Sequence, residues 1–416
     1  ERGWVTPANA ELILKSAEDR PSARRMPVIL AILGAVLIGF AAMSFVAANW
    51  NEISKLAKLA MIFGAMWAAW IAAIMLEKRN HPAYAQAAVL AGLALFGAGI
   101  MLVAQIYHIV TDDPAGVLAW AIASLAAALL LPSRPALALG ILLTVIWSVF
   151  ALQLDGSTPH WAFWFLWAAS AFLAFRLAWG PGFHLVLIAG FVWQAVNAET
   201  ISDAFGIDAT WLLMFATLEA LILWLAAMLA EARATRFSGA AQAYAIVIAF
   251  VLFWIYQLTP ESHALQDGLA NLGAAICAAA TLGLAALILF ALSRRLLELR
   301  HAAAIAAMAF AALVYPYIAA ANPPLVPWLY AALFLAFAAW LVSYGTARDS
   351  RFAVNFGFAA FGVELLWLYF ETLGTLLDTA LFFAAGGVLL IVGAFVMERM
   401  RRRLVAQTEA KSGGAS

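Results

Sequence analysis

Two glutamates interrupt long apolar stretches of the chain and are the residues best placed to do chemistry in an apolar setting. Glu219 lies near the middle of the apolar run 209–230, and Glu364 lies in the run 352–370. An acidic residue at the centre of a membrane-spanning helix costs about 2.5–3.5 kcal/mol. Because burial disfavours the charged carboxylate, we expect Glu219 to be protonated. Each glutamate has two interpretations: a proton or cation site, or a carboxyl group that is hydrogen-bonded between helices.

A second group of polar residues lies where two other apolar runs end. The segments FVAANWNEI and AQIYHIVTDD contain Asn49, Trp50, Asn51, Gln105, Tyr107, His108, Asp112 and Asp113. Gln105 and His108 are three residues apart, and His108 and Asp112 are four apart, so helical spacing places them on shared faces. These residues form a candidate site for a cation, a metal ion or a polar head group. Helix capping and anchoring at the membrane surface explain them equally well.

The composition indicates that the folded chain lies in a lipid membrane rather than in water. Of the 416 residues, 66% are hydrophobic and only 11% are charged, whereas soluble domains carry about 25% charged residues. A spanning helix needs about 20 apolar residues. Runs of this kind predict an all-α, polytopic transmembrane bundle of about 14 spans: 27–49, 56–76, 86–107, 115–131, 135–153, 160–178, 183–199, 209–230, 240–258, 269–292, 301–320, 326–344, 352–370 and 377–397. The fourth and seventh are short, so we expect them to be weakly tilted or partly re-entrant.

The basic residues test this topology, because Lys and Arg concentrate in cytoplasmic loops. With both termini inside, all of the 23 Lys and Arg residues except Lys55 and Lys58 fall on the inner side. One miscounted span would invert every later loop. The sorting therefore predicts an N-in, C-in orientation, with both termini in the cytoplasm.

The spans divide the chain into three parts. Residues 1–26 form a cytoplasmic leader with a short amphipathic helix, residues 27–397 form the transmembrane domain, and residues 398–416 form a basic anchor with a disordered tail. The transmembrane domain can be read as two halves of seven spans. Asn197, in the seventh span, is a further polar position near the outer face, and Cys277, the only cysteine, is expected to be a small core residue.

A family resemblance rests on two stretches, GAVLIGFAAMSFVAANWNEISKLAKLAMIFGAMWAAW at 34–70 and LAGLALFGAGIMLVAQIYHI at 90–109. They resemble domain-of-unknown-function family 2157, predicted bacterial integral membrane proteins. The leader GWVTPANAELI resembles the stretch that precedes the domain in that family. The resemblance covers about the first 130 residues. It implies a bacterial inner-membrane protein with motif residues Asn49, Trp50, Gln105, Tyr107 and His108, but no substrate, reaction or cofactor.

Three functions remain open. Many spans, short loops and isolated carboxyl groups favour a transporter or flippase-like carrier for an apolar or lipid-like substrate. Sparse polar residues and a leader helix favour a non-catalytic scaffold with a membrane protein partner. The pair Asp112 and Asp113 suggests an enzyme acting on a lipid-linked substrate. The sequence contains no Walker A, GxSxG or HExxH motif. We therefore assign no catalytic or metal residue, expect no cofactor and no nucleic acid, and favour a non-enzyme.

Overall fold

The chain folds into antiparallel helices, and no strand occurs in the residues that the structure describes. The structure is a computed structural model, and it describes residues 54–108, 113–154, 156–233, 235–259 and 271–373, with isolated positions within 30–45, 262–265 and 387–391. The chain divides into two compact units, residues 1–200 and 201–416. This division falls between the seventh and eighth predicted spans. The interpretation as two seven-span halves stays a prediction.

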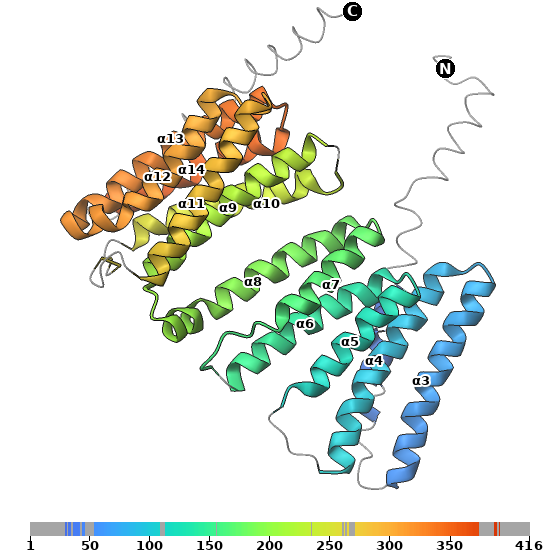
Figure 1. The fold of residues 1–416 in the computed structure, drawn as a ribbon. Coiled ribbons are helices and arrows are strands. Elements are labelled where there is room, and N and C mark those ends of the chain that lie inside the picture. Colours follow the sequence, from blue (N-terminus) through green and yellow to red (C-terminus); the bar gives the residue numbers. More distant parts are fainter. Residues whose placement is uncertain are drawn as a thin grey trace, which may run out of the picture. The chain divides into compact units, whose positions relative to one another are not determined.

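The first unit is a series of helical hairpins. Its helices are α3 (Lys55–Lys78), α4 (Pro82–Ile106), α5 (Ala115–Leu130), α6 (Arg134–Leu154), α7 (Phe163–Arg176) and α8 (Gly180–Phe205), which runs on past the division at Thr200. Helix α3 packs along α4, and α5 packs along α6 (Figure 1). Because α3 and α4 form an antiparallel hairpin, the start of α3 and the end of α4 lie at the same end of the pair.

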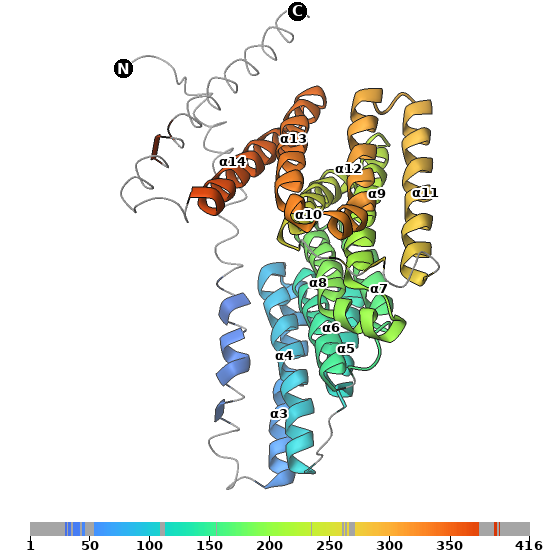
Figure 2. The same ribbon diagram turned by 90° about the vertical axis from the view of Figure 1, so that its left-hand side faces the viewer.

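The second unit is built around α9. Its helices are α9 (Ala209–Glu231), α10 (Ser238–Leu258), α11 (Leu272–Ser293), α12 (Leu299–Ala321), the short 3-10 helix η1 (Pro323–Leu325), α13 (Val326–Ala347) and α14 (Arg351–Leu373). Helix α9 contacts α10, α11 and α12, and the last two stand beside it in Figure 2. Helices α13 and α14 form a close hairpin that packs on α10.

The observed helices follow the predicted spans from 56–76 to 352–370. Ten of the described helices are long and apolar enough to cross a membrane. The prediction of a short seventh span is wrong, because α8 has 26 residues. Its last turns carry polar residues such as Asp203, and a search for apolar runs therefore ended the span too early. Helix α5, with 16 residues, is short as predicted. Most of the first and last predicted spans, and both terminal segments, lie outside the described residues.

Side-chain caps fix where several helices begin. Ser54 accepts a hydrogen bond from the backbone N–H of Ala57 at the start of α3, and Asn271 accepts one from Ala274 at the start of α11. Such caps satisfy backbone donors that have no partner within the helix. They set the helix ends at which the candidate site residues lie.

Glycines let α13 and α14 approach each other closely. A Cβ atom added at Gly345 would lie 2.7 Å from the backbone nitrogen of Val354. One added at Gly357 would lie 2.9 Å from Cγ2 of Val342 and 3.0 Å from the carbonyl oxygen of Ala338. Small residues stabilise helix pairs in lipid because backbones in close contact gain dispersion energy. This close packing holds α14, and with it Glu364, in a fixed position.

Replacing Gly357 with leucine should therefore destabilise the second unit. The new side chain meets the backbone of α13, and overpacking of this kind costs about 1–3 kcal/mol. The matched control is Gly362→Leu on the same helix, where an added Cβ atom meets nothing within 4 Å. Cys277 is buried, so a fluorogenic thiol reagent reports unfolding directly. We expect a lower melting temperature for Gly357→Leu than for Gly362→Leu; equal values would contradict the close packing.

Candidate functional site

Glu364 is fully buried and is hydrogen-bonded to a neighbouring helix. Its side chain has 0% relative exposure, and its Oε2 atom accepts a hydrogen bond of 3.1 Å from Nε2 of Gln257 on α10. Gln257 is itself buried. The contact matches the interpretation of Glu364 as a carboxyl group bonded between helices. It also places an ionisable group where its protonation affects the packing of α10 against α14.

Two tryptophans complete the surroundings of this carboxyl group. Trp254 lies one helical turn before Gln257, and its indole lies beside Glu364. Trp367 lies one turn after Glu364 and packs edge-on against Trp254, with 5.3 Å between the ring centroids. In the described part of the chain, Oε1 of Glu364 and Nε1 of Trp254 each lack a hydrogen-bond partner at ordinary geometry. We call Glu364, Gln257, Trp254 and Trp367 the Glu364 cluster.

Glu219 occupies a different environment. Helical geometry puts it on the side of α9 opposite Thr217, Leu221 and Met228, which are all buried. Glu219 is partly exposed and makes an interaction of its own. Glu364 bonds to α10 rather than to Glu219, so the structure does not join the two candidate carboxyl groups into one site.

The polar residues at the end of α4 are exposed, and their arrangement differs from the helical spacing expected from the sequence. Helix α4 ends at Ile106, and Gln105, Tyr107 and His108 are all exposed. The prediction that Gln105 and His108 share a helix face is wrong. His108 has a φ of 51°, a left-handed conformation that ends a helix and turns the chain away.

The remaining residues of this outer set are only partly described. Asp113 is exposed, and its Oδ1 atom accepts a hydrogen bond of 2.9 Å from the backbone N–H of Ala115 at the start of α5. Asn49, Trp50, Asn51 and Asp112 lie outside the described residues, so a shared site with Gln105 and His108 stays a prediction. Among the described residues, no group of three or more His, Cys, Asp or Glu side chains can hold a metal ion.

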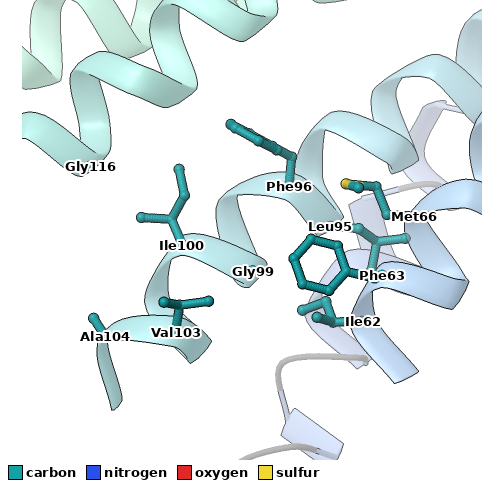
Figure 3. A pocket seen from close by; sticks show the side chains of 10 residues that line it. All are labelled: Ile62, Phe63, Met66, Leu95, Phe96, Gly99, Ile100, Val103, Ala104 and Gly116. Atoms are coloured by element: carbon teal, nitrogen blue, oxygen red, sulfur yellow. The ribbon is translucent and has the colours of Figure 1, made fainter. Parts of the chain in front are cut away.

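An apolar groove lies close to these residues, and the sequence did not predict it. Its volume is about 360 Å³, and it runs between α3, α4 and the start of α5 (Figure 3). Ten residues line it: Ile62, Phe63, Met66, Leu95, Phe96, Gly99, Ile100, Val103, Ala104 and Gly116. None has a polar side chain. We call this space the α3–α4 groove.

Polar residues stand where the groove approaches the end of α4. The lining face of α4 carries Phe96, Ile100 and Val103, and helical spacing continues that face to Tyr107. On α3, Lys55 lies two turns before Ile62 on the same face. Since α3 and α4 are antiparallel, Lys55 and Tyr107 lie at the same end of the groove. The α3–α4 groove is therefore apolar along its length and has polar side chains near one end.

A third cluster surrounds His160, in the loop between α6 and α7. The backbone N–H of His160 donates to Oδ1 of Asn197 at 3.1 Å, and its carbonyl oxygen accepts from Nε1 of Trp193 at 3.1 Å. Its ring nitrogen Nδ1 lies 3.1 Å from Oγ of Ser148, and Trp147 packs edge-on against the ring. Burial lowers the pKa of His160 below its ordinary value of 6.5. Asn197, which was expected from the sequence only to be a polar position near the outer face, thus holds this loop on α8.

These features define a class of protein. Ten apolar helices of spanning length, with polar side chains bonded to one another or to backbone, describe a multi-pass integral membrane protein. Residues 1–137 match the family described as "Predicted membrane protein (DUF2157)", which confirms the resemblance stated above for the first third of the chain. No curated protein and no solved structure matches the chain significantly. All ten groove-lining residues lie within the matched segment.

The His160 cluster should make stability depend on pH. A lowered pKa means that the unfolded chain binds a proton more readily, so the stability from neutral His160 is complete above about pH 6.5 and is lost as pH falls. Melting measured with the Cys277 reagent at several pH values checks this. We expect His160→Gln to reduce the loss of stability toward acid relative to the parent protein. For each protein, the fall in melting temperature is measured from its own value at about pH 8, where His160 is neutral in the folded and the unfolded state. An unchanged slope in His160→Gln would contradict the assignment.

Proposed function

We propose that this protein binds a lipid or a similar apolar molecule in the α3–α4 groove and acts as a carrier for it in the bacterial inner membrane. The groove itself is the observation that carries the proposal. Its volume of about 360 Å³ falls within the range of about 300–1,000 Å³ that is usual for ligand sites. An all-apolar lining suits an acyl chain or another hydrocarbon, because burial of apolar surface needs no polar partner.

The polar end of the groove supports a lipid over a wholly apolar molecule. Lys55 and Tyr107 lie at that end, and Asp113 lies two residues before the start of the neighbouring helix α5. A lipid joins an apolar chain to a polar head group, so the same molecule can use both parts of the site. Lys55, which is exposed, is also one of the two basic residues that the predicted topology places on the outer side, where a head group would meet it.

The scaffold interpretation rests on a different observation. Helix α11 leaves large apolar residues exposed, including Leu282, Leu289 and Phe290. Such a face suits either lipid tails or a helix of a partner protein. The enzyme interpretation has less support, because Asp113 caps α5 through its hydrogen bond to Ala115.

Filling the groove should abolish ligand binding. An added Cβ atom at Gly99 meets nothing within 4 Å, so Gly99→Leu places a side chain in the groove without a backbone clash. Gly64→Leu on α3 is the matched control, since its position is equally open and does not line the groove. Both changes also raise helix propensity by about 1 kcal/mol. The probe is a fatty acid bearing a photoactivatable diazirine, added to vesicles that contain the purified protein.

We expect the parent protein and Gly64→Leu to be labelled within residues 62–66 and 95–104, and Gly99→Leu to lose at least most of that labelling. Equal labelling of all three proteins would overturn the proposal. Native mass spectrometry of the same samples separates the alternatives. A lipid bound in stoichiometric amount supports the carrier, whereas a stoichiometric protein partner without a lipid supports the scaffold.

A further inference from the structure

We propose that Glu364 is a reversible proton-binding site and that Gln257 changes its hydrogen-bonding role when the proton binds. This inference goes beyond the proposed lipid carrier, because it concerns residues of the second unit and uses no residue of the α3–α4 groove. The ligand is a proton taken from water, which forms one O–H bond on the carboxylate and breaks none within the protein.

The geometry of the Glu364 cluster accommodates both protonation states. An indole nitrogen can only donate, so Trp254 suits an acceptor at Oε1 whether or not the acid is charged. A primary amide has both a donor and an acceptor end. In the charged state, Nε2 of Gln257 donates to Oε2, as the structure shows. In the neutral state, the amide turns and its carbonyl oxygen accepts the proton carried by Oε2. In neither state does the O–H of the carboxyl group face the NH2 group of Gln257, so two donors never meet.

No fixed charge competes with the proton for this carboxyl group. On α10, the titratable residues are Tyr244 and Tyr256, and the hydroxyl of Tyr256 lies 3.1 Å from Oγ1 of Thr217 on α9. Gly357 of α14 meets Val342 of α13, and Gly345 of α13 meets Val354 of α14, so the antiparallel register places the apolar segment 331–335 of α13 opposite Glu364. The titratable residue next to this segment is Tyr330, whose hydroxyl donates to the carbonyl oxygen of Ala311 on α12.

The charged groups of α13 and α14 lie at the ends of these helices, away from Glu364. Arg348 caps the opposite end of α13, and on α14 itself the charged residues are Arg351 and Glu371 at the two ends. Within the described part of α10, α13 and α14, the side chain that bonds to the carboxyl group of Glu364 is the neutral amide of Gln257. A buried carboxylate without a cation is strongly disfavoured relative to its neutral form. The charge of Glu364 is therefore balanced only by protonation or by the dipoles of Gln257 and Trp254.

The cluster can be reached from one end of the unit. Helix α10 ends at Leu258, one residue beyond Gln257, whereas α14 continues to Leu373. Glu371 is exposed and lies about 10 Å along α14 from Glu364, on the same face. Trp367 lies between them on that face and is 37% exposed. Glu364 is therefore about two helical turns from an exposed carboxyl group, at the end of α14 that the predicted topology places on the outer side.

Infrared difference spectroscopy of the full-length protein in phosphatidylcholine vesicles tests the site. A protonated carboxylic acid has a C=O stretching band that is separate from the amide bands, and a carboxylate lacks it. We expect the parent protein to show such a band that decreases as pH is raised from about 5 to about 9, the range around neutrality in which a reversible site must titrate. Glu364→Gln should remove the band. Glu219→Gln is the matched control in the same unit and should retain it.

Two results would overturn the proposal: a titrating band of undiminished intensity in Glu364→Gln, or a component lost in Glu364→Gln that does not change with pH in the parent protein. Melting with the Cys277 reagent shows whether each variant is folded. Gln257→Leu provides a second, independent measurement, because it retains Glu364 and removes only the amide. We expect its band to remain but to shift in frequency and to titrate over a different pH range. An unaltered band in Gln257→Leu would contradict the role assigned to Gln257.

Discussion

In a hydrocarbon setting every backbone N–H and C=O group must be bonded within the chain, and this constraint governs the rest of the structure. Helices meet it without help from neighbours. Polar side chains within them meet it in the same way: Ser124, Thr144 and Ser170 each donate to the carbonyl oxygen four residues earlier. A hydroxyl satisfied within its own helix carries no further information. Side chains that bond to another helix, as Gln242 does to Tyr344 and Gln257 to Glu364, carry more information, and of these two pairs only the second contains a carboxyl group.

The same constraint explains why the helices could be predicted from the sequence. Length and apolar composition are sufficient to define a spanning helix, so each predicted span from 56–76 to 352–370 has its counterpart among α3 to α14. Errors occurred where polar residues continue a helix beyond its apolar part, as Glu199 and Asp203 do in α8. The end of α4 was also predicted wrongly. The spacing of three residues between Gln105 and His108 does not reveal that His108 adopts a left-handed conformation and lies outside the helix.

The buried face of each helix could not be predicted, and neither could the difference in burial between the two candidate glutamates. In a soluble protein, polar residues mark the exposed face of a helix. In a membrane, both the protein interior and the lipid are apolar, so that contrast is lost. From the sequence, Glu219 was the clearer candidate because it lies nearer the middle of its span. The structure shows Glu219 partly exposed and Glu364 fully buried. Only the arrangement of α9, α10 and α14 distinguishes them.

The α3–α4 groove follows from how glycines are used on α4. Protein interiors pack densely, so a gap requires a reason. At Gly97 the gap is filled, because an added Cβ atom would lie 2.4 Å from the ring of Trp120. At Gly99, two residues later, nothing lies within 4 Å of such an atom. The side chain of Trp120 thus packs against Gly97, whereas no described side chain packs against Gly99. Gly97 faces α5, whereas Gly99 lies on the side of α4 that lines the groove. The open space at Gly99 is therefore part of the volume that the proposed ligand would occupy.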